Sequence, residues 1–323
     1  MKPNSFLAIA LIVMSTSVGW PQAKYPPETR NAALRYWLAF ALIQDPPADK
    51  ATQDLLEKTS AGEAAWDETR LGAILDANSG AIRTMQRATK LPECDWGLEY
   101  DRGVRAAIPN LARARVLARL NQLTGMREMA KGNSQAAVDT WLAGVRFSQH
   151  LATGGPLIFA LVAKSALLPN LRALSSESRQ GHLSDTQKRH VSEALKGLRE
   201  DGFNWAAAWG FEALTLQQFL VELRGAPNPP ILYESVAGKP MPSGAEVPGT
   251  EDTRRFNAYM ASAQSALNLP PDATKMKLSA LEMQKRALPE IVQMLIPSAQ
   301  RVNDARLEVF TARKELVKSL ATK

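Results

Sequence analysis

Residues 130–141 carry the clearest structural signal in the chain and read Ala130-Lys131-Gly132-Asn133-Ser134-Gln135-Ala136-Ala137-Val138-Asp139-Thr140-Trp141. Gly132 and Asn133 interrupt a run of helix-forming residues, and glycine favours the position just past the end of a helix. The alanines and Trp141 then open a second helix. The stretch therefore predicts the turn and second helix of a helical hairpin, which places the chain among all-α proteins.

Helical periodicity continues on both sides of this hairpin, and no stretch alternates between polar and apolar residues as a half-buried strand does. The expected helices span 28–44, 48–58, 63–90 with a break near 78–80, 108–131, 134–152, 157–174, 184–200, 204–224, 252–267, 273–288 and 290–318. We therefore expect an all-α fold, either an irregular helical bundle or a short right-handed superhelix of helical hairpins.

One long segment interrupts this pattern. Residues 225–250 contain six prolines and four glycines, a composition that predicts a loop without helix. Loops of this length inside compact domains are usually functional or connecting segments. We expect a main helical body over 24–224, a Pro/Gly-rich loop over 225–250, and C-terminal helices over 251–323 that pack on the main body.

The N-terminus has the three parts of a secretory signal. Lys2 supplies a basic start, residues 6–18 are almost all apolar or small, and Gly19 or Ala23 offers a cleavage point. The apolar run is shorter than the roughly 20 residues that a membrane-spanning helix needs. We expect a signal peptide over 1–23 and an exported protein, periplasmic or extracellular; an uncleaved membrane anchor is the alternative.

The net charge and the cysteine content limit which functions and which covalent bonds the chain can have. The formal charge of the 323-residue chain is +7, but no basic cluster of the kind that binds phosphates accompanies it, so nucleic-acid binding is not expected. Cys94 is the single cysteine of the sequence, which excludes an internal disulfide. Free cysteine behaves as a small hydrophobic residue, so we expect a buried thiol; an intermolecular bridge and a reactive group are the alternatives.

The central helices resemble known proteins. The segment from Lys131 to Trp141 is similar to the inter-helix turn of a tetratricopeptide repeat, with Ala137 near its small packing position, although no second copy follows at the expected period. Residues 132–174, followed by a helix that contains Glu212, resemble a group of exported bacterial helical proteins of unknown function. The resemblance implies a helical fold and export, and it implies no activity.

Glu212 is the most unusual residue of the expected helices. Trp205, Glu212 and Phe219 recur every seven residues, which places a carboxylate within an aromatic stripe. Burial would raise the pKa of such a carboxyl group and suit a general acid. A structural ion pair is the competing interpretation, with Arg35 as its first candidate partner, because buried charges usually survive by pairing.

The irregular run 92–101 concentrates acids and aromatic residues on a loop, where binding groups often lie. Its candidates are the carboxylates of Asp95 and Glu99 and the rings of Trp96 and Tyr100; the competing interpretation is a connector with Trp96 in the core. At about 100° per residue, Arg146 and His150 fall on the solvent side of helix 134–152. We include both among the candidate binding residues.

No metal-binding spacing, nucleophile elbow or phosphate loop occurs, and neither metal nor cofactor is expected. We expect an exported binding or scaffold module of the cell envelope rather than an enzyme, with an envelope protein or polysaccharide as partner. Membrane contact is expected only if the N-terminal segment stays uncleaved. Two alternatives remain open: a polysaccharide hydrolase with Glu212 as acid and Asp95 or Glu99 as second carboxylate, and a carrier of an apolar ligand.

Overall fold

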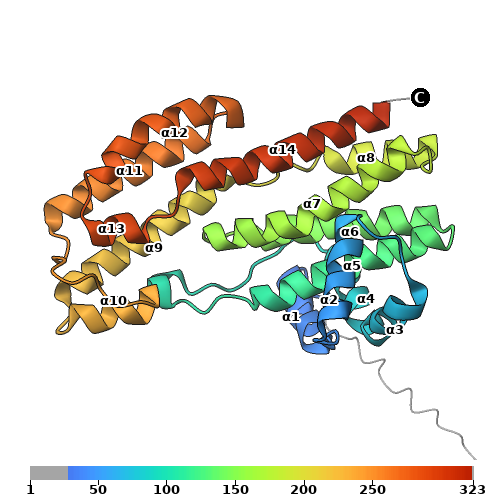
Figure 1. The fold of residues 1–323 in the computed structure, drawn as a ribbon, viewed down its shortest axis with the longest axis horizontal. Coiled ribbons are helices and arrows are strands. Elements are labelled where there is room, and N and C mark those ends of the chain that lie inside the picture. Colours follow the sequence, from blue (N-terminus) through green and yellow to red (C-terminus); the bar gives the residue numbers. More distant parts are fainter. Residues whose placement is uncertain (1–27, 322–323) are drawn as a thin grey trace, which may run out of the picture.

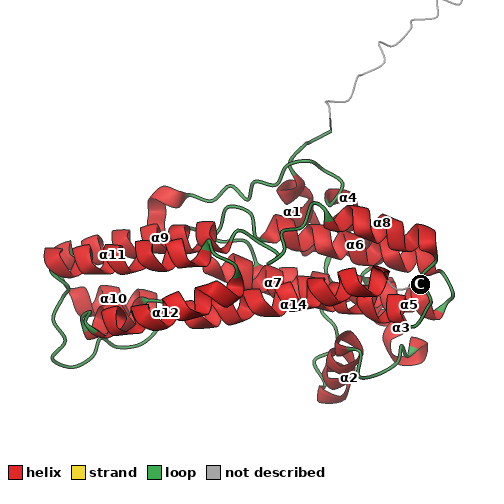
Figure 2. Cartoon of the chain, turned by 90° about the horizontal axis from the view of Figure 1, so that it is seen from above, coloured by secondary structure: helices red, strands yellow, loops and turns green. Residues whose placement is uncertain are grey.

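The computed structural model describes residues 28–321, and the predicted signal peptide lies outside this range. Of these described residues, 73% are helical. Within the described range it forms fourteen α-helices, one 3-10 helix and no strands (Figures 1 and 2). The prediction of an all-α fold is confirmed.

The centre of the molecule is formed by α5 (Leu111–Ala130), α6 (Ser134–Leu151) and α7 (Leu157–Arg179). Helices α5 and α6 form the expected hairpin, and Gly132 adopts a φ of 80° in the turn between them, which other residues rarely adopt. Helix α7 contacts α5, α6, α9 and α14. It is long and apolar enough to cross a membrane, but most of it is buried by these neighbours, as expected for a core helix.

The N-terminal part consists of α1 (Ala32–Leu42), α2 (Lys50–Ala61), α3 (Glu68–Ala77), α4 (Ser79–Ala88) and the 3-10 helix η1 (Tyr100–Arg105). The predicted break lies at Asn78, between α3 and α4. The Asn78 amide donates to the Gln44 and Ile74 carbonyl oxygens, both at 2.9 Å, and accepts from the Gln44 amide. These bonds tie the break to the end of α1, against which α4 packs.

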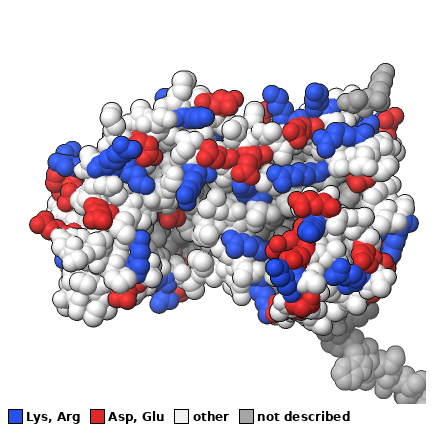
Figure 3. All heavy atoms as spheres, viewed as in Figure 1, with Lys and Arg blue, Asp and Glu red and all other residues white. Residues whose placement is uncertain are grey.

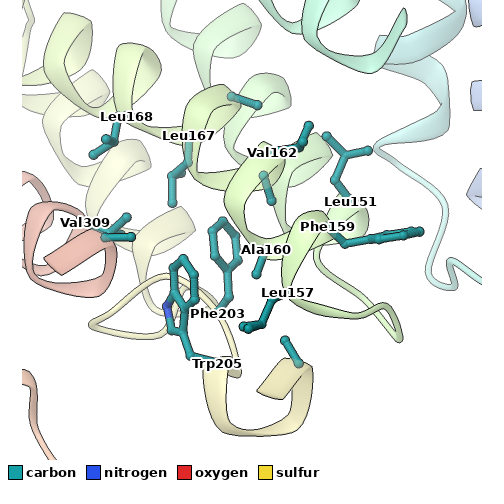
Figure 4. Packing of buried hydrophobic residues seen from close by; sticks show 14 of the residues in the cluster. Leu151, Leu157, Phe159, Ala160, Val162, Leu167, Leu168, Phe203, Trp205 and Val309 are labelled. Carbon is teal, nitrogen blue, oxygen red and sulfur yellow. The ribbon is translucent and has the colours of Figure 1, made fainter. Parts of the chain in front are cut away.

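The C-terminal part consists of α8 (Asp185–Leu195), α9 (Trp205–Gly225), α10 (Pro229–Ala237), α11 (Thr250–Leu267), α12 (Pro271–Arg286), α13 (Glu290–Leu295) and α14 (Ala299–Ala321). Helix α14 packs along α7, and α11 packs along α9. The C-terminal helices therefore share one core with the central hairpin. Figure 4 shows part of that core, where Phe203, Trp205 and Val309 meet apolar residues of α7.

Two expectations about helices were wrong. Residues 225–250 contain α10, because its prolines occupy the first helical turn, where proline needs no amide partner, and Asn228 caps it. The single helix expected over 290–318 is divided into α13 and α14. Pro297 lies in the interruption, and a proline disfavours helical backbone in the residue before it.

Candidate binding site

Most of the residues singled out in the sequence meet where α6 turns into α7. The Trp96 indole donates a hydrogen bond to the His150 carbonyl oxygen at 2.9 Å, and the Tyr36 hydroxyl lies 2.7 Å from His150 Nδ1. The Tyr100 hydroxyl donates to the Gly154 carbonyl oxygen at 2.5 Å, and its ring stacks on Phe211. These contacts hold loop 91–105 against the core, which confirms Trp96 as a buried anchor of a connecting loop.

His150 does not lie on the solvent side of α6. It is 4% exposed, because α6 is covered by α5 and α7 and its end is also covered by Tyr36 of α1. Burial, assisted by the nearby Arg146 charge, lowers the pKa of His150 to about 4. Arg146 itself is exposed, as expected. His150 Nε2 is buried without a hydrogen-bond partner among the described residues.

The expected pairing of Glu212 with Arg35 is wrong. Arg35 pairs with Glu28 instead, while a Glu212 carboxylate oxygen accepts the Leu157 amide at 3.3 Å. Leu157 begins α7, and its N-cap residue Pro156 has no side-chain acceptor, so Glu212 of α9 takes over the capping role. Burial raises the pKa of the Glu212 carboxyl group, and the Leu157 hydrogen bond opposes this shift.

Both candidate partner carboxylates make contacts within their own loop. Asp95 is exposed and accepts the Gly97 amide at 2.9 Å, and Glu99 forms an exposed pair with Arg102. A cavity of about 360 Å³ lies beside Phe211, but Glu212 does not line it. In the described part of the chain, no group of three His, Cys, Asp or Glu residues could hold a metal ion.

Cys94 is half-buried rather than buried, and it is a free thiol. Burial, together with the Asp95 charge, raises its pKa to about 12. The thiol is therefore protonated at neutral pH, and thiolate chemistry is not available to it.

A groove of about 1360 Å³ lies elsewhere in the molecule. One wall is the connection from α2 to α3, the second is the C-terminal half of α5, and the third is α7; we call this space the α5–α7 groove. Pro169, Arg172, Ala173, Ser176 and Arg179 line it from α7. Each of these positions lies three or four residues from another of them, so they share one face of the helix, and that face is open.

The groove combines apolar and charged groups. Trp66 lies on the α2–α3 side, and Met126 and Met129 contribute flexible thioether side chains from α5. Six charged side chains around them form no ion pair within residues 28–321. They are Arg119, Arg172, Arg179, Glu57, Glu63 and Glu315.

A buried amide adds an unused hydrogen-bonding group. Gln122 is 3% exposed and lines the groove, and its Nε2 lies 3.3 Å from the Ser60 carbonyl oxygen. Its Oε1 has no hydrogen-bond partner among the described residues. A buried acceptor without a donor is destabilising, so a ligand N–H at this position would be favoured.

Positive and negative charges are mixed over the surface as they are around the groove. Figure 3 shows acidic and basic side chains interspersed across one face of the molecule, without a large area of one sign.

The exposed His182 and His190 each lie next to a carboxylate. His182 pairs with Glu177 and His190 with Asp139, as expected for solvated histidines.

The sequence did not reveal the α5–α7 groove, because its walls come from three separate segments. The seven-residue spacing of Arg172 and Arg179 was its one available signal. Comparison with known proteins adds no assignment: no family model matches the chain, and neither a curated protein nor a solved structure is significantly similar to it.

Proposed function

We propose that this protein is a binding module that holds a peptide segment of a partner protein in the α5–α7 groove. The observation that carries the proposal is the set of unpaired charges of both signs around Trp66, Met126 and Met129. Methionine-rich surfaces adapt to different side chains, and unpaired charges at a rim select complementary partners. A peptide supplies apolar side chains and charges of both signs together.

Other ligand classes fit this lining less well. The groove is larger than the about 300–1,000 Å³ of typical small-molecule pockets. An apolar ligand would leave the arginines without counter-charges, and a neutral polysaccharide would do the same. The Gln122 Oε1 acceptor suits the backbone N–H of a peptide. The hydrolase alternative gains no support, since Glu212 caps α7 and Asp95 and Glu99 bond to their own loop.

Export to the cell envelope is the second part of the proposal, and it rests on the sequence of residues 1–23. N-terminal sequencing of the protein recovered from the periplasmic or extracellular fraction tests it. We expect a mature chain that begins directly after Gly19 or Ala23. Recovery of the whole protein in the cytoplasm with Met1 intact would contradict export and would leave the binding proposal standing.

Panning a phage-displayed library of random peptides on the protein tests the binding proposal. We expect enriched peptides that combine acidic and apolar residues. Their affinity should fall at least ten-fold in the double variant Arg172→Glu and Arg179→Glu, because both arginines are exposed and the groove loses two cations. Arg83→Glu, at an exposed arginine of α4 outside the groove, is the matched control and should bind normally. A failure to enrich any peptide, or equal binding by all variants, would contradict the proposal.

A further inference from the structure

Helix α1 exposes an apolar face. Leu34 is 58% exposed, Trp37 is 41% and Leu38 is 50%. Together with Ala41 and Leu42 they follow a spacing of three or four residues, opposite the face that packs into the core. Apolar patches of this kind on a soluble protein mark a docking site.

A basic stripe lies on the neighbouring helix. Arg83, Arg87 and Lys90 recur every three or four residues along and just after α4, and all three are exposed. Helices α1 and α4 lie side by side at one edge of the molecule (Figure 2). Neither helix contains an aspartate or a glutamate.

The nearby acidic residues do not neutralise these cations. Glu28 pairs with Arg35, Glu93 pairs with Arg30, and Asp76 pairs with Arg127. The exposed Asp95 accepts the Gly97 amide within its own loop. We call the exposed residues of these two adjacent helices the α1–α4 face; it is apolar on α1 (Leu34, Trp37, Leu38, Ala41 and Leu42) and basic on and just after α4 (Arg83, Arg87 and Lys90).

We propose that the α1–α4 face docks on an anionic lipid surface, with the α1 side chains entering the boundary between headgroups and acyl chains and the α4 cations contacting the headgroups. An apolar helix face beside a cluster of cations is the combination that binds anionic membranes. Tryptophan favours this boundary because its ring is apolar and its N–H can bond to water or headgroups.

The position of α1 in the chain supports a membrane as the occupant. Only thirteen residues lie between Val18, the end of the apolar run, and Ala32, the start of α1. A fully extended chain of that length spans at most about 50 Å. If the apolar run is retained in the membrane as an anchor, this length keeps the start of α1 within about 50 Å of the bilayer.

A second copy of the chain fits this surface less well. Two α1–α4 faces would bring two sets of cations together without any acid on either helix to pair with them. The choice of a membrane as occupant rests on the proposed export, but the inference does not depend on the proposed peptide binding, since no residue of α1 or α4 lines the α5–α7 groove.

Co-sedimentation of the full chain with lipid vesicles tests the inference. The vesicles contain either phosphatidylcholine alone or equal parts of phosphatidylcholine and phosphatidylglycerol. We expect binding to the anionic vesicles that weakens as salt is added. The double variant Leu34→Ser and Leu38→Ser should lose at least ten-fold in partitioning, and Arg83→Ser and Arg87→Ser about five-fold for each cation removed.

Matched variants separate the α1–α4 face from other surfaces. Leu214→Ser alters a leucine that is 65% exposed on α9, and it should bind vesicles like the wild type, as should the groove variant with Arg172→Glu and Arg179→Glu. Salt dependence of the wild type provides a readout that needs no variant. Absence of binding to anionic vesicles, salt-insensitive binding, or equal binding by all variants would overturn the inference. A wild-type dimer that Leu34→Ser and Leu38→Ser convert to monomers would also overturn it and assign the face to a second copy.

Discussion

Gly125 of α5 lies directly beneath the indole of Trp141 on α6, and a methyl group placed on Gly125 would overlap the indole nitrogen. That nitrogen donates a hydrogen bond to the Gln122 carbonyl oxygen at 3.1 Å, so the indole occupies the space that a side chain at residue 125 would need. The relationship explains how residues 130–141 can specify the fold. The turn at Gly132 reverses the chain between α5 and α6, and the absence of a side chain at Gly125 leaves room for the Trp141 indole.

Gly125→Ala should therefore destabilise the protein by about 1–3 kcal/mol, although alanine is the better helix former, because overpacking outweighs helix propensity here. Gly80→Ala is the matched control, since a methyl group on this α4 glycine meets nothing within 4 Å. The control should be neutral or slightly stabilising. Urea denaturation of both variants measures the difference. Equal free energies of unfolding would show that the α5–α6 contact is loose.

The buried pair of Arg306 and Asp201 should dominate the electrostatic contribution to stability. Arg306 is 2% exposed, and its Nη2 donates to Asp201 Oδ2 at 2.9 Å and to the Leu269 carbonyl oxygen at 2.8 Å. Asp201→Ala leaves a buried cation without its counter-charge and should cost about 3–5 kcal/mol in the free energy of unfolding.

A double-mutant cycle identifies the cause of that loss. Arg306→Met combined with Asp201→Ala should cost at least about 1 kcal/mol less than the sum of the two single changes, since neither charge is then stranded. Glu251→Ala removes the exposed partner of Arg254 and should leave the melting temperature unchanged. If the double variant lost as much free energy of unfolding as the two single variants together, Arg306 and Asp201 would not be a coupled pair.

His150 should make the protein acid-sensitive. Its pKa is about 4 in the folded protein, whereas an unfolded histidine has a pKa of about 6.5. As pH falls from about 6.5 to 4 the unfolded chain takes up this proton first, so the folded state loses stability over that window. The shift corresponds to about 3 kcal/mol, at 1.36 kcal/mol per pKa unit.

His150→Gln removes the titrating group while keeping a hydrogen-bonding side chain near Tyr36. The free energies of unfolding of wild type and variant should differ by about 3 kcal/mol more at pH 7 than at pH 4, in favour of the wild type at pH 7. Carboxylates titrate in both proteins and cancel in this comparison. A difference that is the same at both pH values would show that His150 is not buried as a neutral imidazole.

Glu212 should behave as a helix cap and not as an acid catalyst. Glu212→Gln keeps an oxygen for the Leu157 amide and removes a half-buried charge, so stability at pH 7 should be unchanged or higher. Glu212→Ala should lose about 1 kcal/mol, the usual value of a cap. Thermal unfolding of the two variants measures these changes in stability. A large loss of stability in Glu212→Gln would mean that the negative charge itself is required.

Local signals in the sequence were sufficient to predict most helices. They failed to predict features that depend on tertiary packing. Turn residues such as Gly132 and the break at Asn78 act on neighbouring backbone, so they could be predicted. The burial of His150 depends on Tyr36, more than one hundred residues away, and a helical wheel for α6 contains no such information.

For the candidate site, too, local sequence signals identified single residues but not the contacts that tertiary packing gives them. Trp96, Tyr100, His150 and Glu212 do lie at one junction, and there their polar groups bond to backbone groups or to Tyr36. The α5–α7 groove was missed because its walls come from three separate segments. The helix at 229–237 was missed because proline content alone does not distinguish a first helical turn from a loop.

The most direct test of the central claim is an NMR titration of methionine methyl groups with the strongest peptide selected by panning. Met126 and Met129 line the α5–α7 groove, whereas Met276 and Met283 on α12 are 76% and 77% exposed and lie outside it. We predict that the methyl resonances of Met126 and Met129 shift on binding while those of Met276 and Met283 do not. Saturable peptide binding that leaves Met126 and Met129 unchanged would contradict the α5–α7 groove as the binding site.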